Sequence, residues 1–206
     1  MSMEPNPTPP ALVGDVAPEF TLPSVQGQQI SLSNYRDNCR VVLWFSRGFT
    51  CHFCRQFMQK IELGYEALKA NQVEVLQVTP NLLETARIYF DPTTQYPFIC
   101  DPDKRLFAVY GLGDLGVLEA QKNTAVSFGT AFLKGDGIET VRASWIDVAN
   151  KNFLRRLHHH ALTAVEQGLF IIDKQGIIRY RQTYGPLDEI PSGEELLTMT
   201  LAICEE

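Results

Sequence analysis

One continuous stretch constrains the fold of this chain more than any other part of it. The run Val41-Val42-Leu43-Trp44-Phe45 is apolar throughout, which is typical of a central strand covered on both faces, and we predict this strand from Arg40 to Ser46. A short turn at Arg47-Gly48 follows, and then two cysteines separated by two residues, Cys51 and Cys54. An amphipathic helical pattern begins at once and continues to about residue 70. Strand, turn, Cys-x-x-Cys and helix in this order indicate thiol redox chemistry.

The spacing of the two cysteines suits disulfide exchange. A thiolate is the nucleophile in that reaction, and a free cysteine, with a pKa of about 8.5, is mostly protonated at neutral pH. At the first turn of a helix, unpaired backbone N–H groups and the positive end of the helix dipole stabilise the anion of Cys51. Cys54 lies almost one turn further on, within reach of that sulfur. We expect Cys51 to be exposed at the strand–helix corner and Cys54 to be more buried, as the resolving thiol.

Four neighbouring residues are candidates for supporting roles: Arg47, Thr50, His52 and Arg55. The two arginines and the histidine bring positive charge toward the thiolate. A histidine between the cysteines should stabilise the thiolate further, which makes the disulfide form more oxidising.

Composition narrows the class of protein. A chain of 206 residues fits one domain with an insertion, and a hydrophobic fraction of 45% supplies a core. The net charge of −6 argues against nucleic acid or an anionic membrane as the main partner. No apolar run is long enough to span a membrane, and the first ten residues do not resemble a signal peptide, so we expect a reducing, cytoplasmic setting. In that setting the five cysteines do not form a structural disulfide framework.

The first half of the chain alternates between strand and helix patterns. We predict a small hairpin from Glu19–Leu22 and Gln29–Leu32, and a second buried strand at Val73–Val78. A short helix is predicted at Asn81–Phe90 with Asn81 as its N-cap. A short strand follows at Tyr96–Cys100, and Asp101-Pro102 opens a helix that ends near Gly111. This alternation predicts an α/β domain with some parallel pairing.

The second half begins with the least regular region. Residues 112–165 are rich in glycine and are interpreted as a helical and loop insertion, in which Ser144–Ala164 could form one helix. Leu169–Ile172 and Ile177–Arg181 then predict a hairpin. Ser192–Cys204 is an amphipathic helix with Ser192 and Glu195 spaced as a capping box. Residues 1–12 are interpreted as a disordered, proline-rich tail and residues 13–206 as a single domain.

The other candidate metal ligands and thiols are interpreted as structural residues without a catalytic or metal-binding role. A Cys-x-x-Cys pair is often half of a zinc site, but zinc needs four ligands, and His158-His159-His160 point in different directions if they are helical. We interpret that triplet as a solvated helix face. Cys39, Cys100 and Cys204 stand beside apolar residues and are interpreted as core or surface thiols. Trp44 and Phe45 are assigned to the core of the strand. We therefore predict neither a metal nor a cofactor.

Three segments carry a family resemblance: Ala17-Pro18-Glu19-Phe20-Thr21-Leu22 with Leu32-Ser33-Asn34-Tyr35, Asp101-Pro102-Asp103-Lys104 through Val109-Tyr110-Gly111-Leu112, and Gly168 through Arg179. Together they resemble the peroxiredoxin and alkyl hydroperoxide reductase superfamily over roughly Val13 to Arg181, apart from the insertion. The resemblance implies a thioredoxin-like fold, in which a central mixed β-sheet is flanked by helices and the active cysteine lies at a helix N-terminus. The Cys-x-x-Cys is similar to that of the subgroup with a thioredoxin-type motif.

The departures from this family bear on the chemistry. Typical peroxiredoxins carry Pro-x-x-x-Thr-x-x-Cys at this corner; with Cys54 as the last residue, Arg47 stands in place of the proline and Cys51 in place of the threonine. The family's arginine before the late hairpin falls on Gln167. Positioned donors stabilise the transition state in such sites, so their loss argues against ordinary peroxidase catalysis. No cis-proline of the thioredoxin type precedes Gly168 either, since Glu166 and Gln167 occupy that approach.

Three hypotheses follow. The first is a thiol–disulfide oxidoreductase in which Cys51 attacks a substrate disulfide and Cys54 resolves the mixed disulfide, with re-reduction by a thioredoxin- or glutathione-type system. The second is a thiol peroxidase that reduces hydrogen peroxide or organic hydroperoxides, attacking through Cys54 if the peroxiredoxin alignment holds and through Cys51 if the thioredoxin one does. The third is a non-catalytic redox-sensing or zinc-binding module. The resemblance adds a homodimer as an expectation, because family members often dimerise.

Overall fold

The computed structural model describes residues 10–48, 52–90, 94–114, 165–185 and 188–204. Seven strands are described: β1 (Thr21–Pro23), β2 (Gln29–Ser31), β3 (Arg40–Phe45), β4 (Val73–Thr79), β5 (Phe98–Cys100), β6 (Gln167–Ile172) and β7 (Ile178–Tyr184). The helices in these ranges are the 3₁₀ helix η1 (Leu32–Tyr35) and the α-helices α1 (His52–Ala70), α2 (Leu83–Tyr89), α3 (Arg105–Val109) and α7 (Gly193–Cys204).

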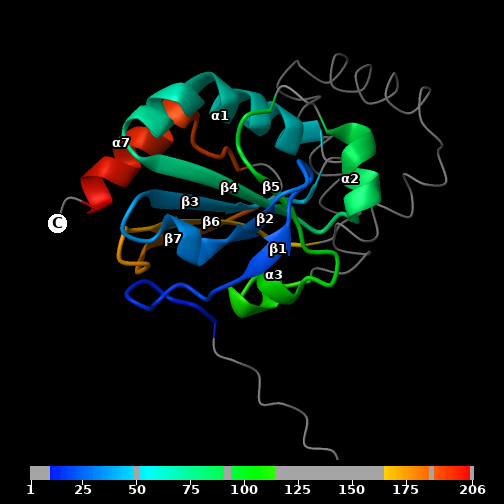
Figure 1. Ribbon diagram of the computed structural model, residues 1–206, viewed down its shortest axis with the longest axis horizontal. Helices are drawn as coiled ribbons and strands as arrows, with labels where there is room; N and C mark the ends of the chain where they lie inside the picture. Colours follow the sequence, from blue (N-terminus) through cyan, green and yellow to red (C-terminus); the bar gives the residue numbers. More distant parts are fainter. Residues whose placement is uncertain (1–9, 49–51, 91–93, 115–164, 186–187, 205–206) are drawn as a thin grey trace, which may run out of the picture.

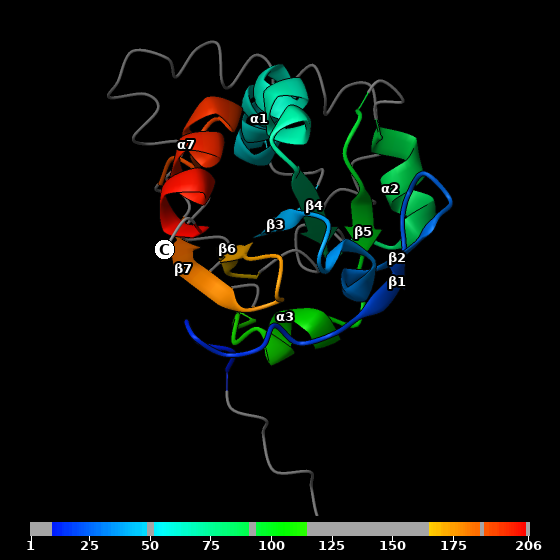
Figure 2. The ribbon, with the colours of Figure 1, turned by 60° about the vertical axis from the view of Figure 1, so that its left-hand side comes forward.

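Five strands form one mixed sheet in the order β5-β4-β3-β6-β7 (Figure 2). Strand β3 lies at its centre and pairs in parallel with β4 and antiparallel with β6. Strands β4 and β5 are parallel, and β6 and β7 form an antiparallel hairpin. The apolar run from Val41 to Phe45 is fully or almost fully buried, as its sequence predicts. The α/β class and the mixed central sheet are confirmed.

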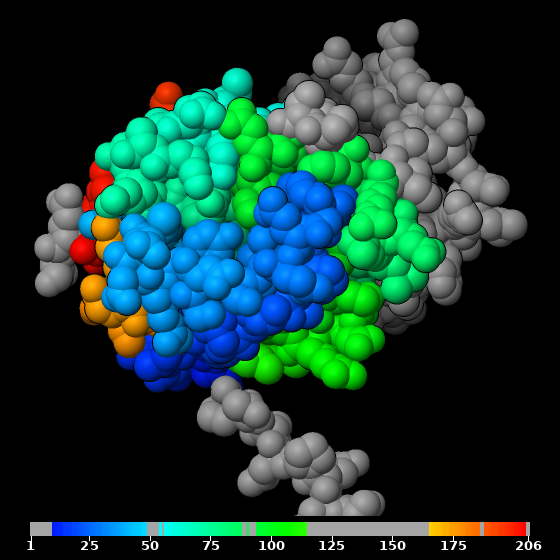
Figure 3. Space-filling view, in the orientation of Figure 1, coloured from blue at the N-terminus to red at the C-terminus, as the bar shows by residue number. Residues whose placement is uncertain are grey.

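Two apolar layers cover the sheet, one on each face (Figure 1). Alternation along β3 sends Val42 and Trp44 to the face under α1 and α7, and Leu43 and Phe45 to the face over α3. The second face is completed by the N-terminal segment, which contributes side chains such as Phe20. Figure 3 shows this segment, in blue, running across the surface between α1 and α3.

The N-terminal hairpin is present as predicted. Strands β1 and β2 pair antiparallel, with Leu22 opposite Ile30. Two isolated bridges connect this region to the main sheet: Ser24 pairs with Ile99 in β5, and Val16 pairs with Ile177, just before β7. The late hairpin and the capping box are also confirmed. The backbone N–H of Ser192 donates to Glu195 at 2.7 Å, and the N–H of Glu195 donates back to Ser192 Oγ at 3.4 Å.

Two helix starts differ from the prediction. Asn81 is not the N-cap of α2, because that helix begins at Leu83 after Leu82; the Asn81 side chain instead accepts a hydrogen bond from Thr79 Oγ1 at 2.7 Å. Asp101-Pro102 does not open α3 directly. Residues 101–104 form a turn that ends at Lys104 with φ 56°, and α3 begins at Arg105. The Asp101 carboxylate then accepts hydrogen bonds from the first N–H groups of that helix.

Other predictions fall outside the described residues. These are most of the proline-rich tail, the body of the insertion at 115–164, the helix at Ser144–Ala164 and the histidine triplet at 158–160. Among the helices that the structure describes, none is both long enough and apolar enough to cross a membrane.

Helix α7 crosses α1 at a pair of glycines. A Cβ added to Gly64 would lie 2.7 Å from the Cα of Gly193, and a Cβ added to Gly193 would lie 2.8 Å from the carbonyl oxygen of Ile61. Both obstacles are backbone atoms, which cannot move aside without shifting a helix. The absence of side chains at this crossing therefore lets α7 pack directly against α1.

We predict that Gly64→Ala destabilises the protein by about 1–3 kcal/mol, as overpacking does elsewhere. The sign is informative, because the same change in an unobstructed helix interior stabilises by roughly 0.5–1 kcal/mol. Urea unfolding measures the difference. Leu63→Ala is the matched control: its side chain is 90% exposed on the same helix, so its effect should stay within about 0.5 kcal/mol. A Gly64→Ala variant more stable than the parent would contradict the contact.

Candidate thiol site

Cys54 is the first residue on the buried face of α1 that the structure describes. Its position is the third residue of the helix, and its side chain is 0% exposed. The same face continues along the helix through Phe57, Ile61 and Leu68, at spacings of three, four and seven residues. These apolar residues pack on the sheet under α1, so the register that buries them also turns the Cys54 sulfur inward. The first turn of a helix leaves backbone N–H groups without intrahelical partners.

The polar group at the Cys54 sulfur comes from the far half of the sequence. Gln167, the first residue of β6, is 2% exposed, and its side-chain oxygen Oε1 lies 3.5 Å from Cys54 Sγ, which donates the hydrogen bond. Alternation along β6 places Gln167 on the same face as Leu169 and Ile171, which belong to the layer under α1. Strand pairing thus brings this carboxamide to the first turn of the helix.

A chain of buried polar side chains lies near the same end of the sheet. Gln77 Nε2 donates to Ser46 Oγ at 2.8 Å, and Ser46 Oγ donates to the carbonyl of Val78 at 3.2 Å. The Tyr96 hydroxyl lies 3.4 Å from Gln77 Oε1 and 3.5 Å from the carbonyl of Met58 in α1. Ser46, Gln77 and Tyr96 are all 0% exposed. Because each has a partner, the network tolerates burial and ties α1 to β3 and β4.

The turn between β3 and the cysteines is shaped by Gly48. Its φ is +91°, in the left-handed region that favours glycine. A Cβ at this position would overlap Asn81 Oδ1 and would lie 2.9 Å from Thr79 Oγ1. Both side chains are buried and hydrogen-bonded to each other. The turn after β3 therefore packs against the end of β4 through a contact that only glycine allows.

Arg47 brings a guanidinium to the end of β3. Its Nε and Nη2 atoms are buried, and they have no hydrogen-bond partner within the described part of the chain. Arg36 and Arg181 each have a single nitrogen, Nε, in the same condition. A buried charged donor without an acceptor is unfavourable, so a guanidinium with two such donors favours an anion.

The structure describes only part of the predicted site. Cys51 and Thr50 lie outside the described residues, and so do the side chains of His52 and Arg55, whose backbone belongs to α1. Cys54 and Arg47 are described. Cys54 is buried, while the exposure of Cys51 and the greater burial of Cys54 relative to it stay predictions.

Cys39, Cys100 and Cys204 are free cysteines, not joined in disulfide bonds. Cys100 is buried in β5, and burial raises the pKa of its thiol to about 12, against a smaller opposing effect of Arg87. Burial also raises the pKa of Cys204. Cys39 is half-buried. Within the described ranges, no cluster of three or more His, Cys, Asp or Glu side chains is placed to hold a metal.

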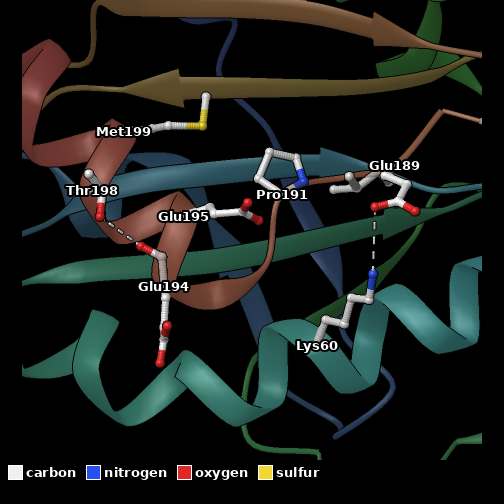
Figure 4. A pocket seen from close by; sticks show the side chains of 8 residues that line it. Lys60, Glu189, Pro191, Glu194, Glu195, Thr198 and Met199 are labelled. Atoms are coloured by element: carbon white, nitrogen blue, oxygen red, sulfur yellow. Dashed lines mark hydrogen bonds and ion pairs between the residues drawn. The ribbon is translucent and has the colours of Figure 1, made fainter.

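A groove of about 520 Å³ lies between α1 and the start of α7. Its lining includes Lys60, Glu189, Glu194, Glu195 and Met199, and Figure 4 shows Lys60 extending from α1 toward Glu189. The ion pair between these two side chains spans 3.9 Å and is largely exposed. Cys54 is not among the described residues that line this groove.

Comparison with known proteins identifies the family. The sequence profile of the AhpC/TSA family matches residues 13–181, which is most of the chain. This chain belongs to the AhpC/TSA family.

One curated relative is "Putative peroxiredoxin Rv2521" of Mycobacterium tuberculosis, which is 26% identical over 99 residues. That match covers 48% of this chain and 62% of the relative, so this chain spans somewhat less than two thirds of the relative's length.

Solved structures share the fold at low sequence identity. The reduced 2-Cys peroxiredoxin of Plasmodium vivax has a TM-score of 0.63 at 15% identity, and covers 93% of this chain and 95% of its own. The "putative Thiol:disulfide interchange protein DsbE" of Chlorobium tepidum has a TM-score of 0.57 at 17% identity, and covers 93% and 96%. These likenesses confirm the predicted thioredoxin-like fold and, at such identities, the fold alone.

Sequence reasoning found the cysteine pair but missed most of the polar side chains around it. Gln77 lies in a predicted buried strand, where a glutamine at an inward position of an apolar run signals a buried partner. Ser46 ends the predicted strand, and the local pattern assigns it no role. The resemblance places Gln167 where the family carries an active-site arginine, and that position is the signal that it lies near Cys54.

We predict that Gly48→Ala destabilises the protein more than Gly27→Ala does. Both glycines have nearly the same φ, +91° and +90°, but nothing lies within 4 Å of a Cβ at Gly27. Each change carries a left-handed backbone penalty of roughly 1–2 kcal/mol, so the difference between the two isolates the collision with Asn81 and Thr79. Thermal unfolding of both variants measures it. Equal losses would show that the turn has room for a side chain.

Proposed function

We propose that this protein is a thiol–disulfide oxidoreductase that works through Cys51 and Cys54. The observation that carries the proposal is the complete burial of Cys54 at the first turn of α1. A sulfur with no exposed surface does not meet a protein disulfide directly. It can, however, attack a disulfide formed on the cysteine three positions earlier, at the same helix end. Membership of the AhpC/TSA family supports thiol redox chemistry on this scaffold.

The reaction balances as two successive exchanges. The Cys51 thiolate attacks one sulfur of the substrate disulfide, which forms a mixed disulfide and releases the other sulfur as a thiolate. Cys54 then attacks the Cys51 sulfur as a thiolate, and its proton passes to the substrate thiolate released in the first step. This second step releases the remaining substrate thiolate and leaves a Cys51–Cys54 disulfide, so the substrate gains two electrons and the pair loses two. A thioredoxin- or glutathione-type reductant of a reducing, cytoplasmic compartment restores the dithiol.

Charge and backbone groups around the pair support the first step. The N-terminal end of α1 favours an anion at Cys51. Arg47 lies two residues after β3, and its buried Nε and Nη2 atoms have no partner within the described part of the chain. In this proposal the guanidinium pairs with an anionic sulfur or an anionic group of the substrate. Arg55 adds positive charge in the sequence next to the cysteines, and His52 does so when it is protonated.

Peroxide reduction is the second candidate, and the family itself favours it, since the curated relative carries a peroxiredoxin name. In that reaction a cysteine thiolate attacks the peroxide, becomes a sulfenic acid and releases water or an alcohol; the other thiol then condenses with it to a disulfide and releases water. The uncharged Gln167 beside Cys54 offers less stabilisation to a thiolate than a cation would. For this reason we rank disulfide exchange first.

We predict that Cys51→Ser abolishes the reduction of insulin disulfides, whereas Cys54→Ser still attacks and accumulates the mixed disulfide. Mass spectrometry of each variant after exposure to insulin identifies the trapped species. Cys100→Ala is the matched control, because that thiol is also buried and, with a pKa of about 12, stays protonated at neutral pH. It should retain the parent activity.

The same variants separate the two reactions. Rapid consumption of hydrogen peroxide with a sulfenic acid trapped at Cys54, and no reduction of insulin by the parent protein, would overturn disulfide exchange in favour of the peroxidase. A mixed disulfide on Cys54 in the Cys51→Ser variant would reverse the assigned roles of the two cysteines.

A further inference from the structure

The contact between Cys54 and Gln167 joins two residues 113 positions apart. The two side chains belong to the described residues and are 0% and 2% exposed. A glutamine side chain carries one acceptor and two donors and is expensive to bury without a partner. At the start of β6, where an apolar side chain would fit the layer under α1, the chain instead presents a carboxamide to a sulfur. A hydrogen-bonding role at the Cys54 sulfur explains a glutamine at position 167 better than apolar packing does.

The orientation of the hydrogen bond matters for the chemistry. Cys54 Sγ donates to Oε1 at 3.5 Å, so the acceptor binds the protonated thiol. A neutral acceptor stabilises the protonated form and offers no charge to a thiolate. The same bond restricts rotation of the Cys54 side chain and directs the sulfur toward the sheet until a disulfide forms nearby.

We propose that Gln167 is the positioning residue of the resolving thiol: it holds Cys54 protonated and oriented while Cys51 reacts with the substrate. This inference rests on the proposed function and deepens it. It explains how two thiols at one helix end are kept in different states, with the outer one nucleophilic and the inner one held back. The division prevents the inner sulfur from competing for the substrate.

Two other titratable groups of the surrounding elements have described partners of their own. The Glu166 carboxylate, just before β6, accepts a hydrogen bond from the N–H of Gly113 at 2.8 Å. The Tyr96 hydroxyl contacts Gln77 and Met58, and burial raises its pKa well above the usual value. The charged groups nearest to Cys54 in the sequence are His52 and Arg55 on α1, and Arg47 follows β3. Each of these three stays unchanged in the variants below.

The test places a charge at Gln167 in a Cys51→Ser background. The ionisation of Cys54 is followed over a range of pH by the ultraviolet absorbance of its thiolate, as the difference from the same protein with Cys54→Ser added. We expect Gln167→Glu to raise the midpoint of this titration, and Gln167→Lys to lower it, each by about one unit or more, because a charge within hydrogen-bond distance shifts a titration by roughly 1–3 units. Gln182→Glu and Gln182→Lys are the matched controls. Gln182 is an exposed residue of the neighbouring strand β7, where screening keeps the shift small.

A second measurement does not require a buried charge. Gln167→Asn keeps the amide but withdraws it by one methylene group. With both cysteines present, a chromogenic aromatic disulfide releases one coloured thiolate when Cys51 attacks and a second when Cys54 resolves. We expect Gln167→Asn to slow the second release about five-fold or more and to leave the first within about two-fold, because only the later step uses the oriented sulfur.

These outcomes separate the inference from the function. Titration midpoints that respond equally to the Gln167 and Gln182 changes, or a Gln167→Asn variant in which both releases slow together, would overturn the role of Gln167. Failure of the parent protein to reduce insulin would instead overturn the proposed function, and the titration would still report on the Gln167–Cys54 contact, since the difference spectrum reads Cys54 alone.

Discussion

The packing of α1 on the central sheet is the interaction on which the rest of this structure depends. One face of the helix, from Cys54 through Phe57, Ile61 and Leu68, lies in the same apolar layer as Val42 and Trp44 of β3. Only one face of a helix contacts the sheet, so the register that buries the apolar residues also fixes the direction of the Cys54 sulfur. Shifting that register by one residue would expose both the apolar stripe and the thiol.

Hydrogen bonds between buried polar side chains also hold α1 in place on the sheet. The Gln77, Ser46 and Tyr96 network reaches the carbonyl of Met58 in α1. Further along, the Tyr65 hydroxyl donates to Glu74 at 2.6 Å, and Lys69 donates to the same carboxylate at 2.8 Å. Apolar burial supplies most of the free energy, but these directional contacts limit how the helix can slide or rotate over β4.

The same frame explains how one scaffold serves different thiol chemistry. The sheet and its helices place a cysteine at a helix N-terminus, and the residues facing that cysteine determine what the sulfur does. Here one of the groups facing the sulfur is the carboxamide of Gln167. This neutral group is consistent with the resolving role that we propose for Cys54.

Local patterns in the sequence predict the elements and their order, including the apolar run of β3, the helical stripe of α1, the late hairpin and the capping box at Ser192. They erred where a side chain had two possible partners. Asn81 could cap a helix or pair with Thr79, and the proximity of β4 to the Gly48 turn settled the choice. The family resemblance placed Gln167 at a site position, but its hydrogen bond with Cys54 depends on the strand pairing between β3 and β6, which carries it across a long stretch of chain. Local periodicity contains no record of such pairing.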